Sequence, residues 1–147
     1  MYKYNVTPSF LNINRKFGIL EYAVLCLCKK YDFYFKHLDY FFKKIRPLSY
    51  NLKYVIDHKE GIIGFNIFEY HGNVIGDEEH IISSQFLFVD PKHRNKGIAT
   101  ELLNLPDICD NPIYRVEVKK SELRFFDKQG YKFKRLSKTG EYLVLEK

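Results

Sequence analysis

One stretch, residues 86–103, constrains the fold most, because it joins a strand, a turn, a basic loop and a helix in direct succession. The apolar run Phe86-Leu87-Phe88-Val89 predicts a buried strand, and Asp90-Pro91 predicts a turn. The next loop contains Gly97, and a helix is predicted over 97–105. Unpaired N–H groups converge at a helix start, where the helix dipole adds positive charge, so the segment is typical of a phosphate-binding site. A solvated basic turn is the alternative interpretation of the loop alone. The side chains available to supplement the amides are Arg94, Lys96 and Thr100.

The rest of the chain alternates between helical and strand periodicity. We predict helices over 14–31, from Asp32 as N-cap to Arg46-Pro47, over 97–105, and over 122–129 with Ser121 as N-cap. We predict strands over 2–6, 51–58, 62–70, 81–89, 113–118, 131–136 and 141–145. This order predicts a mixed α/β domain in which at least one crossover helix joins parallel strands.

The length of 147 residues fits a single domain, 1–147. No apolar run is long enough to span a membrane, and no signal peptide opens the sequence. We therefore expect a cytoplasmic protein without a membrane partner.

The spacing of cysteine and histidine predicts no metal site. The three cysteines, Cys26, Cys28 and Cys109, match no zinc or haem pattern, and we expect core thiols in a reducing compartment. Surface or turn roles are expected for His58, His71, His80 and His93.

Positive charge is concentrated in the N-terminal third of the chain. Residues 1–50 hold nine basic and three acidic side chains, an excess equal to the net charge of +6 of the whole chain. A basic surface attracts nucleic acid, phosphorylated ligands or acidic proteins. The alternative is a lysine-rich solvent face of ordinary helices.

Two segments resemble the signature motifs of the GNAT superfamily, the acetyl-CoA-dependent N-acetyltransferases. Val89-Asp90-Pro91, followed by Arg94-Asn95-Lys96-Gly97-Ile98-Ala99, resembles the family pattern V-x-P and R/Q-x-x-G-x-G/A. Phe125-Phe126-Asp127-Lys128-Gln129-Gly130-Tyr131 resembles the F-Y-x-K-x-G-F segment. The resemblance implies a mixed, twisted sheet flanked by helices, with central strands that splay apart at the cofactor site.

The resemblance also implies acetyl-CoA, or another acyl-CoA, as co-substrate. Its pantetheine arm would pair with the backbone of Leu87, Phe88 and Val89. Its pyrophosphate would rest on the amides of Arg94, Asn95, Lys96, Gly97, Ile98 and Ala99, supplemented by Thr100. We assign Phe126 and Lys128 of the second motif to the cofactor site as well.

The sequence departs from the family at the positions that handle protons. The tyrosine that often protonates the departing thiolate is replaced by Phe126, and the glutamate six residues before Val89 by Ser83. We predict that Ser83 holds a water that relays a proton toward Glu79, or toward His80 if the strand is bulged. An exposed acidic turn without a catalytic role is the alternative. Pro106 also ends the signature helix earlier than is usual in the family.

These features predict an N-acetyltransferase that moves an acetyl group from acetyl-CoA to an amine by direct transfer. A non-catalytic CoA-binding or nucleic-acid-binding module is the alternative. The acceptor could be a protein lysine or N-terminus, a small amine, an aminoacyl-tRNA or an amino-modified nucleobase. The basic N-terminal third favours an anionic acceptor, either a nucleic acid or an acidic peptide. The oligomeric state is left open.

Overall fold

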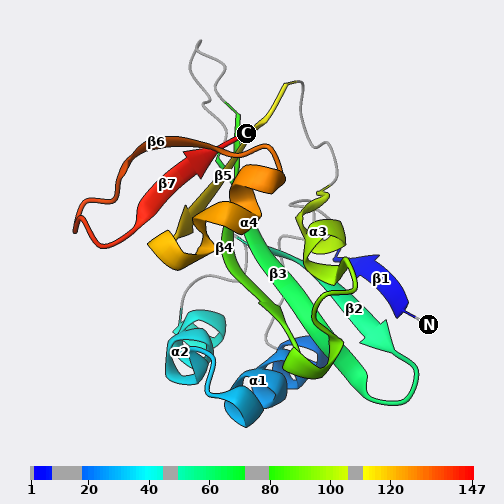
Figure 1. Ribbon diagram of the computed structural model, residues 1–147. Coiled ribbons are helices and arrows are strands. Elements are labelled where there is room, and N and C mark those ends of the chain that lie inside the picture. Colours follow the sequence, from blue (N-terminus) through cyan, green and yellow to red (C-terminus); the bar gives the residue numbers. More distant parts are fainter. Residues whose placement is uncertain (1, 8–17, 45–49, 72–79, 106–110) are drawn as a thin grey trace. The chain divides into compact units, whose positions relative to one another are not determined.

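The computed structural model of the protein describes residues 2–7, 18–44, 50–71, 80–105 and 111–147 (Figure 1). Its strands are β1 (Tyr2–Val6), β2 (Asn51–Asp57), β3 (Gly61–His71), β4 (Ile81–Val89), β5 (Ile113–Val118), β6 (Lys132–Leu136) and β7 (Leu143–Glu146). Its α-helices are α1 (Ile19–Tyr31), α2 (Phe35–Lys44), α3 (Ile98–Leu103) and α4 (Leu123–Lys128), and two 3-10 turns are η1 (Pro91–His93) and η2 (Lys120–Glu122).

Within these residues, one seven-stranded mixed sheet has the order β1-β2-β3-β4-β5-β7-β6. β1 and β2 pair antiparallel, and so do β5 and β7, and β7 and β6. β4 and β5 are parallel, and α3 lies in the connection between them. The predicted mixed sheet flanked by helices is therefore confirmed.

Contacts along the chain divide it into two compact units. The first unit contains Met1–Ile67 and Phe86–Asn104, and the second contains Phe68–Gln85 and Leu105–Lys147. The prediction of a single domain over 1–147 stays a prediction. Each unit is described separately below.

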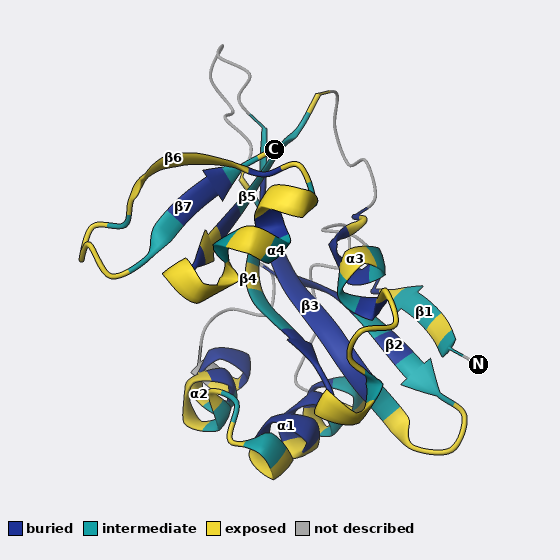
Figure 2. Cartoon of the chain, viewed as in Figure 1, coloured by how far each residue is buried: buried dark blue, intermediate teal, exposed yellow. Residues whose placement is uncertain are grey.

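In the first unit, α1 and α2 bury one side each in an aromatic core (Figure 2). The predicted apolar face of α1 is confirmed, because Val24 and Leu27 are buried while Leu20 and Tyr31 pack against the same core. The other buried members of this core are Leu25, Cys28, Leu38, Phe41, Phe42, Tyr50, Leu52, Phe65, Ile67 and Phe88. The part of the predicted first helix before residue 18 lies outside the described residues.

Asp32 ends the first helix and does not cap the second, so the predicted N-cap is wrong. Its backbone is left-handed, with φ 52°, and its N–H points back to the carbonyls of Cys28 and Lys29. A short polar side chain tolerates this conformation better than most, so Asp32 does what glycine usually does at a helix end. α2 begins three residues later, at Phe35.

A second cluster of the first unit packs α3 against the sheet. Its buried members are Val55, Ile63, Val89, Ile98 and Leu102. The buried Asn66 side chain donates from Nδ2 to the carbonyl of Leu102, 3.0 Å away. This cluster fixes the helix that follows the basic loop.

The second unit buries apolar side chains of its strands and of α4. The buried side chains are Phe68, Ile82, Leu105, Val116, Val118, Phe126, Tyr131, Val144 and Leu145. Ser121, predicted as the N-cap of α4, instead lies inside η2. The Glu122 carboxylate accepts the N–H of Lys119 at 3.0 Å and so completes the cap there.

Candidate active site

The signature turn, which we define as residues 89–99, adopts an unusual backbone. Asp90 caps η1 by accepting the N–H of Lys92 at 2.9 Å. Asn95 and Gly97 are both left-handed, with φ 63° and 78°. Asparagine and glycine are the residues that tolerate this conformation best, which explains why the sequence places them here. The loop consequently bends twice before α3 begins at Ile98.

The loop presents its polar side to solvent. Arg94, Asn95, Lys96, Gly97 and Thr100 are exposed, whereas Ile98 is buried and Ala99 is half-buried. A Cβ atom added to Gly97 would meet no atom within 4 Å, so the space in front of its backbone is open. Within the described part of the chain, Lys96 forms no ion pair. The exposed backbone and the cationic side chains of this loop fit the predicted phosphate-binding role.

Arg94 folds back onto the strand that precedes it. Its Nε donates to the carbonyl of Val89 at 2.9 Å, and its guanidinium carbon lies 5.4 Å from the centre of the Phe88 ring. The cation is thus held at the start of the loop by a hydrogen bond and by the ring face.

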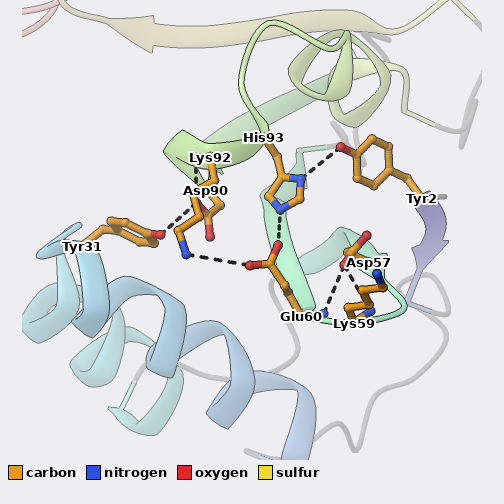
Figure 3. Close-up of polar contacts among 8 residues, drawn as sticks. All are labelled: Tyr2, Tyr31, Asp57, Lys59, Glu60, Asp90, Lys92 and His93. Atoms are coloured by element: carbon orange, nitrogen blue, oxygen red, sulfur yellow. Dashed lines mark hydrogen bonds and ion pairs between the residues drawn. The ribbon is translucent and has the colours of Figure 1, made fainter.

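Asp90 anchors the beginning of the turn (Figure 3). Its Oδ1 accepts the Tyr31 hydroxyl at 2.8 Å, which ties the turn to the end of α1. Burial acts to raise the pKa of this carboxyl, but hydrogen bonds from the Lys92 N–H and the Tyr31 hydroxyl, with the nearby Lys30 and His93, lower it overall. The Asp90 side chain is therefore an ionised acceptor that holds the turn.

His93 anchors the end of η1, a role that its sequence spacing does not reveal. Its Nδ1 lies 3.0 Å from the Tyr2 hydroxyl, and its Nε2 contacts the Glu60 carboxylate (Figure 3). These partners are 91 and 33 residues away in sequence, so only the fold brings them together.

The far end of α3 is held by Lys53, another residue that the sequence does not single out. This lysine is 5% exposed, and its Nζ donates to the carbonyls of Glu101 and Asn104 at 2.5 and 2.6 Å. The Glu101 carboxylate lies 3.2 Å from the same nitrogen. Lys53 thus donates to two carbonyls at the end of α3, of which that of Glu101 also accepts the Asn104 N–H at 3.1 Å.

Strand β4 leaves β5 after half of its length. The ladder extends from Ile81↔Ile113 to Ser84↔Val116, although β4 continues to Val89 and β5 to Val118. The Asp90 N–H donates to the Ile63 carbonyl of β3 at 2.7 Å. Because backbone groups alternate in direction along a strand, the polar groups of Val89 point away from β3. This is the strand segment that the sequence assigns to the pantetheine arm.

The predicted proton-handling residues lie in or next to the second unit's part of β4. Ser83 is half-buried, and its Oγ accepts from the side-chain amide of Gln85 at 3.0 Å. Glu79 lies outside the described residues. The alternative base, His80, stacks on Tyr70 with an interplanar angle of 13°, and its Nδ1 is 2.5 Å from the Tyr70 hydroxyl.

The second motif is divided between the core and the surface. Phe126 is 5% exposed and meets Phe125 and Tyr131 edge to face, with ring centres 5.0 and 5.5 Å away. Burial raises the pKa of Tyr131 to about 12. Lys128 is exposed at the end of α4. The assignment of Phe126 and Lys128 to the cofactor site stays a prediction.

The described residues also bear on metal and membrane partners. No group of three or more His, Cys, Asp or Glu side chains there is arranged to hold a metal ion. Among the helices described, none is long and apolar enough to cross a membrane.

Comparisons with known proteins agree on one family. The family model for the acetyltransferase (GNAT) domain matches residues 50–133, more than half of the chain. No curated protein sequence gives a significant match.

Solved structures share the fold at low sequence identity. Arabidopsis thaliana NAA60 in complex with acetyl-CoA is 11% identical, with a TM-score of 0.63 over 99% of this chain and 97% of that one. Glucosamine-6-phosphate N-acetyltransferase from Arabidopsis thaliana is 13% identical, with a TM-score of 0.63 over 92% and 95%. A Trypanosoma brucei acetyltransferase is 14% identical, with a TM-score of 0.65 over 93% and 96%. The motifs, the family match and the shared fold lead to one conclusion: the chain belongs to the GNAT acetyltransferase family.

Proposed function

We propose that this protein is an N-acetyltransferase that moves an acetyl group from acetyl-CoA directly to an amine. The observation that carries the proposal is the signature turn, whose left-handed Asn95 and Gly97 leave an exposed backbone next to Arg94 and Lys96. The family match and a structural neighbour solved with acetyl-CoA support the same co-substrate.

The residues present fit an acyl-CoA. The open space in front of Gly97 admits a diphosphate against the amides of Arg94 to Ala99, and exposed Lys96 and Thr100 add a cation and a hydroxyl. The backbone of Leu87 to Val89 would hold the pantetheine arm. Within this segment, the Val89 carbonyl already accepts a hydrogen bond from Arg94 Nε. Acyl-CoA supplies an activated thioester with a thiolate leaving group. Phe126 and Lys128 complete the proposed cofactor set.

The chain's own contribution to the reaction would be positioning and proton transfer. Holding two reactants in the reactive geometry lowers the activation free energy by several kcal/mol, on the order of 7–11 at best. An alkyl amine is protonated near neutral pH, so a base must take its proton. Ser83, whose hydroxyl is oriented by Gln85, would hold the water that relays this proton toward Glu79.

The acceptor is proposed to be an anionic molecule that carries an amine, such as an amino-bearing nucleic acid or an acidic peptide. Exposed lysines on α1 and α2 contribute part of the excess charge, namely Lys29, Lys30, Lys36 and Lys43. Of these, Lys43 is paired with Asp39 at 2.9 Å. Acceptor binding should therefore weaken between about 50 and 200 mM salt, and an affinity indifferent to salt would exclude this class. We also propose a cytoplasmic location; Cys26 and Cys28, the cysteines among the described residues, are not joined in a disulfide.

Calorimetry with acetyl-CoA tests the cofactor site. Gly97→Glu places a carboxylate in the open space before the loop, and we expect affinity to fall more than about 100-fold. Gly140→Glu is the matched control, because Gly140 has the same φ of 78° and the same open space in the β6–β7 turn. It should bind acetyl-CoA like the parent.

Turnover distinguishes the enzyme from the non-catalytic alternative. The parent should release free CoA thiol when acetyl-CoA is supplied with cell extract, and mass spectrometry should find the new acetyl group on an amine. Binding without turnover on any acceptor would favour the non-catalytic CoA-binding module. An affinity unchanged by Gly97→Glu would remove the signature turn from the cofactor site.

A further inference from the structure

We propose that His93 is a positioning residue for the cofactor loop: it fixes the signature turn in the conformation that binds the pyrophosphate of acyl-CoA. The inference rests on the proposed function. His93 immediately precedes Arg94, and it is the last residue of the 3-10 turn from which the loop departs.

The His93 ring is gripped from two sides (Figure 3). Tyr2 on β1 reaches Nδ1 at 3.0 Å, and the two rings meet edge to face with centres 5.6 Å apart. Glu60, in the turn between β2 and β3, contacts Nε2. The His93 side chain is only 12% exposed, against 39% for Glu60. The ring therefore has two partners from distant elements and little freedom to turn.

The partners suit both protonation states of the imidazole. An ionised carboxylate only accepts hydrogen bonds, so Nε2–H donates to Glu60. Nδ1 then accepts the Tyr2 hydroxyl when the ring is neutral, or donates to its oxygen when the ring is charged. Tyr2 and Glu60 can thus bond the ring in either state. Among the described residues, Lys92 also faces Glu60, with its Nζ 3.9 Å from the Glu60 carboxylate.

Glu60 is itself held in place by the turn that carries it. Asp57 Oδ2 accepts the N–H groups of Lys59 and Glu60, each at 3.1 Å. These hydrogen bonds lower the pKa of Asp57 overall, although burial acts to raise it. The carboxylate that grips His93 is consequently part of an ordered turn.

The signature turn is therefore anchored at both ends of η1, by Asp90 to Tyr31 and by His93 to Tyr2 and Glu60. The four residues that follow, 94–97, are all exposed, and two of them are left-handed. Losing the second anchor would let this stretch sample other conformations, so ordering it would cost part of the binding free energy. His93 should thus govern cofactor affinity through the backbone that it holds.

The test is calorimetry with acetyl-CoA, performed well below the melting temperature, where destabilised variants stay folded and a loss of stability alone leaves the dissociation constant unchanged. Removing hydrogen bonds to a charged partner in His93→Leu should weaken binding about tenfold. His93→Gln keeps an amide N–H that can reach Glu60 and should stay within about threefold of the parent. His71→Leu, an exposed histidine of β3 whose Nε2 lies 3.5 Å from the Glu69 carboxylate, is the matched control and should bind like the parent.

A second variant checks that the contact with Glu60 is responsible. Glu60→Leu should weaken binding in the same direction as His93→Leu, and the double variant should lose clearly less affinity than the sum of the two single losses, because both variants remove the contact between His93 and Glu60. Parent-like affinity in His93→Leu, equal losses in His93→Leu and His93→Gln, or additive losses in the double variant would each overturn the inference while leaving the proposed function intact. Absence of acetyl-CoA binding by the parent would overturn both.

Discussion

The signature turn and the stretch of β4 that is predicted to handle protons differ in the contacts that hold their residues in place. The turn is held by several contacts. Asp90 and His93 hold η1 through their side chains, and Asn95 and Gly97 adopt left-handed backbones. Lys53 holds the far end of α3. In the β4 stretch, Ser83 has the Gln85 amide as its recorded side-chain partner.

The difference follows from the two kinds of chemistry. A diphosphate is bound by backbone N–H groups, so a short local pattern of glycine, asparagine and small residues is enough to build its site. A proton is moved by one side chain at one point in space, and any element that reaches that point can supply it. The diphosphate-binding motif is accordingly recognisable in a local stretch of sequence, although distant residues such as Tyr2 and Glu60 hold its backbone in place. An acid or base cannot be recognised from local sequence in the same way.

The largest expected effect tests how far the helix that follows the signature turn, α3, depends on the contacts of Lys53. Lys53→Met removes the buried donor that serves the carbonyls of Glu101 and Asn104, and the loss of hydrogen bonds from a charged group costs about 1.5–3 kcal/mol. We expect the free energy of unfolding, measured with urea, to fall by about 3 kcal/mol. Lys59→Met, on an exposed residue, should change it by less than about 0.5 kcal/mol. A loss as small as that of the control would mean that the end of α3 needs no anchor.

The next largest effect tests the other side of the comparison. If Ser83 holds the relay water, Ser83→Ala should lower kcat about tenfold and alter the low-pH limb of the pH–rate profile, where a general base must first lose its proton, with acetyl-CoA affinity unchanged. Glu79→Gln should alter the same limb. Ser84→Ala is the matched control, because the neighbouring side chain points to the opposite face of the strand.

A parent-like rate and low-pH limb in both Ser83→Ala and Glu79→Gln would exclude these residues from proton transfer. The acceptor would then have to arrive deprotonated, as a weakly basic aromatic amine would.

A smaller effect concerns Asp90, and it depends on pH. The folded-state pKa of Asp90 is lowered below 3.8, so its ionised form contributes stability above that pH, and the contribution is lost as the pH falls through the folded pKa. Asp90→Asn should reduce the free energy of unfolding at pH 7 by about 1 kcal/mol. The gap between parent and variant should close below about pH 4. A gap independent of pH would show that the charge of Asp90 does not hold the turn.

Elements governed by local pattern were the most predictable from the sequence. Strand β1 and the apolar face of α1 follow directly from the spacing of their apolar residues, and Asp90-Pro91 forms the expected turn. The N-cap predictions for Asp32 and Ser121 are wrong, because a cap depends on the backbone angles of the residue itself and not on its type alone. The contacts of His93 and Lys53 join residues that are 33 to 91 positions apart, so no local pattern announces them.

The smallest expected effect comes from restoring the family's tyrosine. In Phe126→Tyr, a hydroxyl is added to a side chain that is 5% exposed and packed edge to face between Phe125 and Tyr131. A buried hydroxyl needs a hydrogen-bond partner, so the variant should lose about 1 kcal/mol of stability if none is available. Its kcat should stay within about threefold of the parent, since a hydroxyl shut into the core cannot donate to a departing thiolate. Steady-state kinetics with acetyl-CoA and urea unfolding measure the two quantities, and Phe133→Tyr, on an exposed ring of β6, is the control. A tenfold rise in kcat would instead mean that position 126 reaches the reacting atoms. In that case the chain would lack only one oxygen atom of the usual acid, while Ser83 would still replace the glutamate that the family often has on this strand.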